Sequence, residues 1–367
     1  MTKRTTSKLV VLLALLVWAV NVMDALADSG FFPTGYQDSW CVEFNATERA
    51  LYVVHANEED GLALGDRFTK LDADTFAIVD EFTVTGQAVG EFIYLQSESK
   101  IYFINMLTAQ LVEYDCTLDT VTRSVAVEPY PRSLLISPDG FTIFVSCGEY
   151  PKFGPSSDPD YLAPRRGKLL KIDRASFSVV DSETSYSGPV EMAINSAGTR
   201  LYLANAVQMD TRSGDSQTDL WSMIEVFDPS TLNLIREFEV GYPCIGDGSS
   251  DHVILGGCTE FDRPPLLLDM ALDQTTVIDT STLGNHRDRF SALSTDPALN
   301  NGFILTSMYG DESPCSFAVI DLTTLSVSPY TITEPGHLNR IFIDEAGNQL
   351  ILWSKEVDGL YSVSPIP

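Results

Sequence analysis

The sequence predicts an all-β protein, a seven-bladed β-propeller, on three observations. Six segments share an alternating apolar run, an Asp, a short polar turn and a second alternating run. Seven short apolar segments, such as KIYFINML and TRLYLANA, form a second series that interleaves with the first. Beyond the N-terminal segment, no stretch shows the sustained 3.6-residue period of an amphipathic helix. Repetition of one strand-turn-strand unit indicates blades around a ring.

The Asp of the repeat marks the end of the third strand of each blade. The segment IEVFDPSTLNLIREFEV from Ile224 is a clear copy. The recurring residues are Asp72, Asp115, Asp173, Asp228, Asp269 and Asp321, with Ser364 at the aligned position of the last copy. The shortest spacings give a unit of about 42 residues, the length of one four-stranded blade. We expect each Asp to accept backbone N–H groups in the following turn.

The last copy ends one strand short, after GLYSVSPIP. Residues from Phe31 to Gln37 precede the first inner strand, so we expect them to supply the outer strand of the last blade. An N-terminal strand that completes this blade would close the ring and remove two exposed sheet edges. Residues 28–367 are therefore predicted to form a single propeller domain.

The N-terminus has the pattern of an export signal. Three basic residues precede an apolar run, Leu9 to Val20, which small residues follow in Ala25-Leu26-Ala27. We expect residues 1–27 to be a cleaved signal peptide, with an uncleaved anchor as the alternative. The mature chain has no other long apolar run, so no membrane association is expected after cleavage. The predicted location is secreted or periplasmic, or a secretory lumen if the source is eukaryotic.

The charge balance is strongly acidic. Asp and Glu number 51 and Lys and Arg number 23, which gives a formal net charge of -28 and a pI near 4.3. Nucleic acids would be repelled by most of such a surface, so nucleic-acid binding is not expected. We expect a monomer.

Six cysteines lie beyond the expected cleavage point, in a compartment where disulfides persist. No Cys-x-x-Cys motif occurs. Cys244 is expected to begin the inner strand of blade 5, and Cys258 to end the strand paired with it. Both would lie near one end of the same hairpin, so a Cys244–Cys258 disulfide is predicted.

The repeats resemble a known family. The runs LYLANAV, SMIEVFDPSTLNLIREFEVGYP and RSLLISPDG are similar to the YVTN-type seven-bladed β-propeller repeat of exported bacterial and archaeal proteins. More distantly, they are similar to the heavy chain of quinoprotein amine dehydrogenases and to lactonase-type propellers. The resemblance implies a propeller fold and an exported protein. No catalytic motif of either enzyme group is matched residue by residue.

Two insertions in adjacent blades are expected to form long loops, Gly148 to Gly167 and Val207 to Ser222. In a propeller such loops share a face with the mouth of the central channel. Long loops in compact domains are often functional. The first hypothesis is therefore a secreted binding or interaction module that uses this insertion-bearing face.

Polar and aromatic residues are expected to surround the channel mouth on that face. Three arginines among them could clamp a carboxylate or phosphate of a small molecule, and a protein partner on the same face is the other possibility. The predicted ligand-binding residues are Arg132, Arg289, Arg340, Tyr130, Tyr242 and Asn339.

The alternative hypothesis is an enzyme on the same scaffold, such as a lactone hydrolase or isomerase. Its candidate catalytic residues are His286, His337 and Glu191, which could transfer protons at the channel mouth. Two histidines are too few to predict a metal site, and no cofactor is predicted. Calcium stays an open alternative, because the insertions hold carboxylates without EF-hand spacing. These carboxylates are Asp158, Asp160, Asp210, Asp215 and Asp219.

Overall fold

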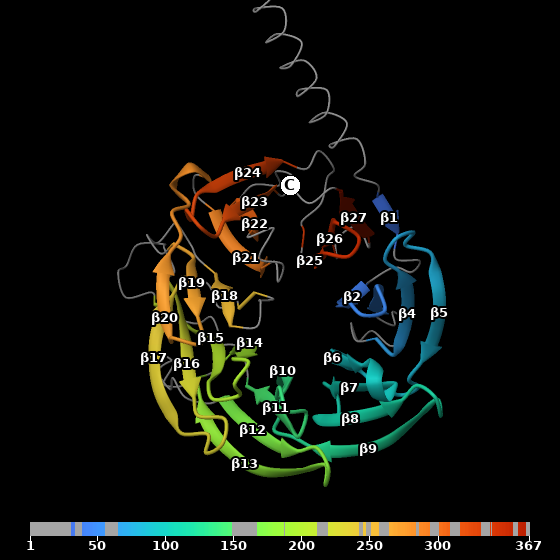
Figure 1. Ribbon diagram of the computed structural model, residues 1–367. Coiled ribbons are helices and arrows are strands. Elements are labelled where there is room, and N and C mark those ends of the chain that lie inside the picture. Colours follow the sequence, from blue (N-terminus) through green and yellow to red (C-terminus); the bar gives the residue numbers. More distant parts are fainter. Residues whose placement is uncertain are drawn as a thin grey trace, which may run out of the picture.

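The computed structural model is a ring of antiparallel sheets around a central space, as predicted (Figure 1). Seven sheets follow one another in chain order, and each is one blade of a β-propeller. The structure describes residues 31–33, 39–55, 65–148, 167–186, 188–210, 219–241, 245–246, 251–256, 264–283, 286–293, 301–308, 316–331, 338, 340–354 and 359–364.

The first four blades each contain four strands, numbered from the channel outward. Blade 1 contains β2 (Ser39–Asn45), β3 (Ala50–His55), β4 (Arg67–Asp72) and β5 (Ile78–Thr83), and blade 2 contains β6 (Val89–Leu95), β7 (Lys100–Asn105), β8 (Gln110–Asp115) and β9 (Thr120–Ala126). Blade 3 contains β10 (Pro131–Ile136), β11 (Thr142–Cys147), β12 (Gly167–Asp173) and β13 (Ser178–Ser185). Blade 4 contains β14 (Pro189–Ile194), β15 (Leu201–Asp210), β16 (Asp219–Phe227) and β17 (Leu234–Val240).

The last three blades complete the ring. Blade 5 contains β18 (His252–Leu255), β19 (Leu266–Asp269) and β20 (Gln274–Val277). Blade 6 contains β21 (His286–Leu293), β22 (Asn301–Met308), β23 (Ser316–Asp321) and β24 (Val327–Thr331). Blade 7 contains β25 (Arg340–Asp344), β26 (Gln349–Ser354), β27 (Gly359–Val363) and β1 (Phe31–Pro33). Two short 3-10 helices, η2 (Gln96–Glu98) and η5 (Ser281–Leu283), lie in connections.

The core is divided among the seams, the interfaces between neighbouring blades. Seven apolar clusters occur, one in each seam. In the seam between blades 1 and 2, for example, Phe68 stacks on Phe82 at 4.8 Å and meets Phe92 edge-on at 5.3 Å. Each sheet is therefore buried on both faces by its neighbours, which explains why its middle strands read as nearly continuous apolar runs.

The repeated Asp has the structural role that the sequence predicted. In blade 1, the Asp72 carboxylate accepts hydrogen bonds from the backbone N–H groups of Asp74 and Thr75 at 3.1 and 2.9 Å. The other five aspartates accept from the same turn positions. The fourth residue after each Asp has a positive φ of 52–57°. The turn thus joins the third and outer strands of six blades in one conformation.

Blade 7 joins residues from both ends of the chain. β1 pairs antiparallel with β27 in the register Phe31 to Tyr361 and Pro33 to Gly359. The function of this pairing as a latch stays a prediction and is taken up below.

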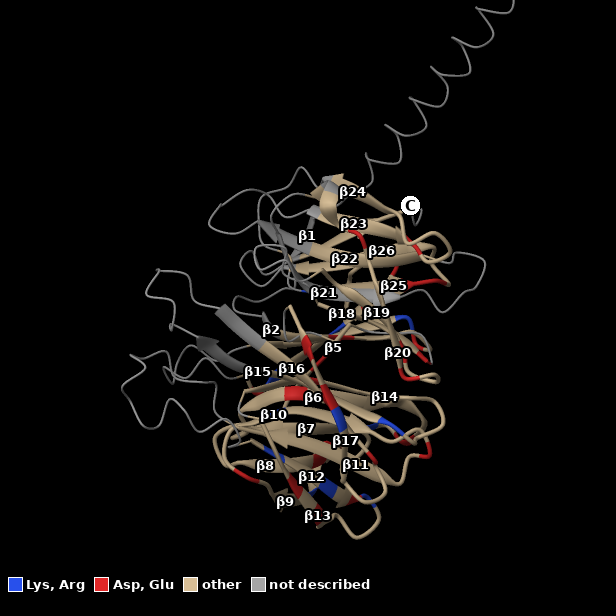
Figure 2. Ribbon diagram, turned by 90° about the vertical axis from the view of Figure 1, so that its left-hand side faces the viewer, with Lys and Arg blue, Asp and Glu red and all other residues tan. Residues whose placement is uncertain are grey.

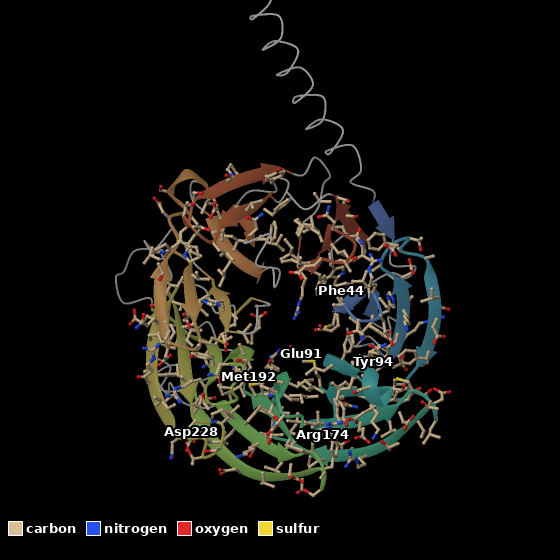
Figure 3. All side chains as sticks on the ribbon, viewed as in Figure 1. Phe44, Glu91, Tyr94, Arg174, Met192 and Asp228 are labelled. Atoms are coloured by element: carbon tan, nitrogen blue, oxygen red, sulfur yellow. The ribbon has the colours of Figure 1, made fainter. Side chains whose placement is uncertain are left out.

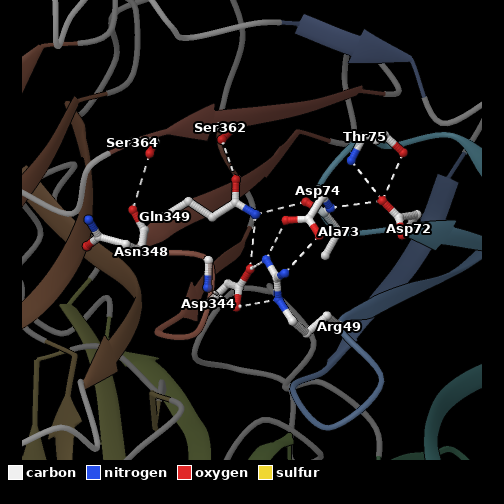
Figure 4. Close-up of polar contacts among 11 residues, drawn as sticks. Arg49, Asp72, Ala73, Asp74, Thr75, Asp344, Asn348, Gln349, Ser362 and Ser364 are labelled. Atoms are coloured by element: carbon white, nitrogen blue, oxygen red, sulfur yellow. Dashed lines mark hydrogen bonds and ion pairs between the residues drawn. The ribbon is translucent and has the colours of Figure 1, made fainter.

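The seam between blades 7 and 1 is held by a polar network (Figure 4). The Arg49 guanidinium forms ion pairs with the buried Asp344 and the exposed Asp74, both at 2.6 Å. Gln349 donates to the Ala73 carbonyl at 2.8 Å and to Asp344 at 3.0 Å. Burial opposes ionisation of Asp344, but the bonds from Arg49 and Gln349 outweigh it and lower the pKa of this carboxyl.

Blade 5 is the exception to the four-strand pattern. β18, β19 and β20 form a three-stranded sheet of four-residue strands. In the position of an inner strand, the described residues form one isolated bridge, between Ile245 and Leu255.

Candidate functional site

The inner strands share a bulge where they begin, at the rim of the channel mouth. One extra residue interrupts the pairing with the second strand in blades 1, 3, 4 and 6, and blade 2 has the same irregularity between Val89 and Phe92. The extra residues are Trp40, Arg132, Val190 and Arg289. A bulge leaves one residue of the strand without a direct partner in the ladder, and this feature recurs at the same end of these inner strands.

Two of the three predicted arginines are therefore bulge residues, and the third begins an inner strand. Arg132 lies in the bulge of β10, Arg289 in that of β21, and Arg340 is the first residue of β25. Arg340 also forms an ion pair with Glu43 at 3.6 Å. The strand arrangement places all three backbones on one rim, in blades 3, 6 and 7.

Several other predicted site residues lie beyond what the structure describes. His337, Tyr242 and Asn339 fall outside the described residues, and of His286 and Arg289 only the strand positions are described. Tyr130 is half-exposed, with a positive φ of 58°, just before β10.

Glu191 takes part in a contact between blades. Its carboxylate accepts a hydrogen bond from the backbone N–H of Ile245 at 2.6 Å. At the equivalent position of blade 2 is Glu91, which lies beside the central space in Figure 3. It accepts a hydrogen bond from the backbone N–H of Leu134 at 2.8 Å. Leu134 and Ile245 are themselves equivalent in the register of their blades. The two glutamates therefore form the same inter-blade clasp. The repeated Glu in VGEFIYL and PVEMAI was the signal for it in the sequence.

The predicted disulfide cannot be placed, because Cys244 and Cys258 lie outside the described residues. The described cysteines, Cys41, Cys116 and Cys147, are free thiols. Burial raises the pKa of Cys116 and of Cys147 to about 12, so both are protonated at neutral pH.

The blade 4 insertion was wrongly expected to be a loop throughout. β15 and β16 continue past the end of the blade as an antiparallel ribbon, paired as far as Asp210 and Asp219. The equivalent second strand of blade 2 ends at Asn105, which corresponds to Asn205. The ribbon thus extends the sheet by five residues on the side of the channel mouth. Of the blade 3 insertion, residues 149–166 lie outside the described residues.

Within the described ranges, no group of three or more His, Cys, Asp or Glu side chains is arranged to hold a metal ion. Of the calcium candidates, Asp210 and Asp219 face each other across the ribbon as backbone partners, and Asp158, Asp160 and Asp215 lie outside the described residues. None of the helices in those ranges has the length and apolar character needed to cross a membrane.

The described cavities lie in seams. One of 480 Å³ opens between blades 3 and 4, lined by residues such as Pro138, Lys171 and Ser196. Two more, of 320 and 310 Å³, lie between blades 1 and 2 and share Tyr52 and Tyr94. Clefts of about 300–1,000 Å³ are of the size that accepts small ligands.

The seam between blades 2 and 3 is instead filled by a charged network. The Glu113 carboxylate accepts hydrogen bonds from Lys100 at 3.1 Å, from Thr122 at 2.6 Å and from Tyr102 at 2.8 Å. Arg123 forms a bidentate contact with the same carboxylate. Glu113 is 1% exposed. Burial alone would raise its pKa, but the donors, Arg123 foremost, outweigh it and lower the pKa to about 2. No local pattern in the sequence predicted this network.

Comparisons with known proteins bear on the fold alone. No protein-family model matches the chain, and no curated protein sequence matches it either. Among solved structures, the chain is similar to the WD40 domain of Neurospora crassa Pan2, at 11% identity, a TM-score of 0.59 and 90% coverage of both chains.

Two further structures are similar over nearly the whole chain. A chain of Kuenenia stuttgartiensis hydrazine synthase matches with 12% identity and a TM-score of 0.63, over 90% of this chain and 97% of that one. A chain of a mitotic checkpoint complex matches with 10% identity and a TM-score of 0.62, over 91% of this chain and 90% of that one. At these identities the likeness shows a seven-bladed β-propeller with WD40-like neighbours, a scaffold that is commonly an interaction module.

Proposed function

We propose that this chain is an exported interaction module whose insertion-bearing face is the contact surface. The observation that carries the proposal is the β15–β16 ribbon of blade 4, which continues beyond the blade on the side of the channel mouth. The second strand of blade 2, at the equivalent position, ends five residues earlier, at Asn105. Such a projection from a rigid scaffold is typical of a contact element.

The rim of the channel mouth offers a smaller ligand a place on the same face. Arg132 and Arg289 are bulge residues of their inner strands and Arg340 begins its own, in a chain with a formal charge of -28. A small carboxylate or phosphate fits this chemistry, because guanidinium groups bind both in a bidentate way. Large polyanions would be repelled by the surrounding acidic surface.

Two photo-crosslinking variants of the mature chain test the contact surface. One carries the crosslinker at Gln217, in the blade 4 insertion, and the other at Ser97, in the β6–β7 turn of the opposite face. Irradiation is done in the extracellular or periplasmic fraction of the source. We expect adducts of defined mass from position 217 and none from position 97. Equal adducts at both positions, or none at position 217, would contradict the proposed face.

Thermal shift with citrate and inorganic phosphate tests the rim. An anion that binds only the folded state raises the melting temperature. We expect the shift to disappear in Arg340→Met and to persist in Arg200→Met, which changes an arginine before β15, at the opposite face. A shift that is equal in both variants would exclude a specific anion site at the rim.

The compartment and the domain limits belong to the same proposal. Residues 1–27 act as a cleaved signal peptide, and residues 28–367 form a single monomeric propeller with β1 as the strand that closes the ring. The pairing of β1 with β27 supports this arrangement. We also retain the Cys244–Cys258 disulfide, which peptide mapping without reduction would detect.

A further inference from the structure

The repeats allow one seam to be compared with another, position by position. The register makes Tyr52, Tyr102 and Tyr202 equivalent on the second strands of blades 1, 2 and 4. On the outer strands it makes Asp80, Arg123 and Arg236 equivalent. The residue directly after the repeated Asp faces the preceding blade in each of these seams. At this position Cys116 of blade 2 corresponds to Arg174 of blade 3 and Met270 of blade 5.

Two seams contain guanidinium groups of the chain itself, stacked on aromatic rings. Between blades 2 and 3, Arg174 lies 5.2 Å from the Tyr102 ring centre and pairs with Glu98, while Arg123 lies 4.6 Å from the Phe177 ring (Figure 3). Between blades 4 and 5, Arg236 lies 5.1 Å from the Phe238 ring and pairs with an aspartate at 2.7 Å. A guanidinium against rings and carboxylates is thus a repeated solution in this molecule.

The seam between blades 1 and 2 has the same surroundings without the guanidinium. The arginine positions are occupied by Asp80 and Cys116, and a cavity of 310 Å³ opens there. Its aromatic lining consists of Tyr52, Phe82, Tyr94 and Tyr114.

The charges of this cavity are unbalanced toward the negative. Lys70 is the one basic residue that lines it, and its ammonium is paired with Glu48 at 2.7 Å. Asp80 and Asp119 also line the cavity, and within the described residues neither forms an ion pair. The Asp119 carboxylate accepts a hydrogen bond from the Tyr114 hydroxyl. The Lys70 ammonium lies 5.4 Å from the Tyr52 ring centre, and Phe82 is stacked on Phe68 and on Tyr114. The cavity therefore offers a cation the carboxylates of Asp80 and Asp119 and the rings of Tyr94 and Tyr114.

We propose that this cavity binds the arginine side chain of a partner polypeptide, in the place that the chain's own arginines fill in its sister seams. A planar guanidinium suits the site better than an ammonium, because it stacks on rings and pairs with carboxylates at the same time. The strongly acidic surface favours a basic partner. The site faces away from the insertions, because Cys116 and Asp119 lie in a turn of the opposite face, whose turns carry several acidic positions (Figure 2).

The test uses the peptides Ac-Gly-Arg-Gly-NH2 and Ac-Gly-Cit-Gly-NH2, in which citrulline keeps the shape of arginine without its charge. Binding to the mature protein is measured by saturation-transfer NMR. We expect the citrulline peptide to bind at least about tenfold more weakly, since it loses both the ion pairs and the cation–π contact. Equal binding of the two peptides would overturn the proposal.

Variants locate the site. Cys116→Arg places a guanidinium at the position of Arg174 and should abolish binding, whereas Cys116→Ser should keep it. Asp80→Asn and Asp119→Asn should each weaken binding about fivefold or more. Asp181→Asn is the matched control, because Asp181 has the position of Asp80 in blade 3. Unchanged binding in folded Cys116→Arg would overturn the proposal. An equal loss of binding in Asp80→Asn and Asp181→Asn would also overturn the proposal. If Cys116→Arg does not fold, the comparison of these two variants decides the test.

Discussion

At the residue scale, Glu113 shows how a buried carboxylate is kept charged. It is 1% exposed, yet its pKa is lowered to about 2 because Arg123, Thr122, Tyr102 and Lys100 all donate to it. Buried charges are tolerated in proteins when they are paired and hydrogen-bonded in this way. The energetic consequence is that loss of either the charge or a donor leaves the other partners unsatisfied.

The pH dependence of stability follows from the lowered pKa of Glu113. In the folded state this carboxyl binds its proton less readily than in the unfolded chain, so its stabilisation is complete above about pH 4.5 and is lost as the pH falls toward 2. We expect Glu113→Gln to lower the free energy of unfolding by about 3 kcal/mol at pH 7. In urea titrations from pH 7 to 2.5, the difference between parent and variant should shrink. A difference that stays constant over that range would contradict the assignment.

Arg49 offers a second residue-scale prediction, because it pairs with one buried and one exposed carboxylate. The Asp344 side chain is 2% exposed and that of Asp74 is 57% exposed. Asp344→Asn should cost about 3 kcal/mol of unfolding free energy, since it leaves Arg49 and Gln349 with a neutral partner. Asp74→Asn should change it by no more than about 0.5 kcal/mol. Chemical denaturation of both variants decides this, and similar losses would count against the distinction.

At the scale of elements, the inner strands are tied to one another by side chains as well as by packing. Glu91 in β6 and Glu191 in β14 each accept a hydrogen bond from a backbone N–H at the inner position of the next blade. Glu191→Ala should lower the unfolding free energy by about 2 kcal/mol, because the Ile245 N–H loses its acceptor. Glu191→Gln retains an acceptor and should cost less than half as much. Thermal melts of the two variants provide the measurement, and equal effects would argue against the clasp.

The sequence predicted the strands and the Asp turns well because both depend on local signals. Alternation of apolar residues marks a strand, and an Asp before a polar turn accepts the N–H groups that the turn exposes. The bulges and the seams were missed because they depend on register and on contacts between blades. The two ends of the insertion, as far as Asp210 and from Asp219, were wrongly expected to be loop. Their polar residues lack the alternation of a buried strand, although their backbones pair.

The candidate site could be predicted only in part. The repeat alignment assigned Arg132, Arg289 and Arg340 to the channel mouth, and their ligand-binding role stays a prediction. Their backbones lie in the inner strands β10, β21 and β25. The repeated Glu of VGEFIYL and PVEMAI was a signal for the contact of Glu191 with Ile245, but its partner lies in the next blade and could not be read from the sequence. The cavity at Cys116 could not be predicted from the sequence either, because side chains of two neighbouring blades line it.

At the scale of the whole molecule, the ring depends on the seam between blades 7 and 1, where distant parts of the chain meet. An apolar cluster around Val42, Phe342 and Trp353 fills this seam, and the Arg49 network covers it. β1 adds an outer strand to blade 7. If this strand acts as a latch, as predicted, closure leaves no blade with an exposed sheet edge at the junction.

Removal of β1 tests its function as a latch. Deleting Asp28 to Gln37 should lower the melting temperature by about 5 °C or more, because β27 becomes an exposed edge and one blade loses a strand. Deleting Asp28 to Gly30 alone, which leaves β1 intact, should have little effect. Calorimetry of both deletions checks the prediction. An unchanged melting curve after the longer deletion would show that the ring closes without β1.

The three-stranded sheet of blade 5 makes the ring uneven in its resistance to opening. β18, β19 and β20 are four residues long, whereas the strands of blade 2 have six or seven. Fewer ladder hydrogen bonds give a lower local free energy of opening. Amide protons of β18 to β20 should therefore exchange with deuterium before those of β6 to β9. Transient breathing of the propeller would begin at blade 5, which makes that sector the natural place for a protease to enter.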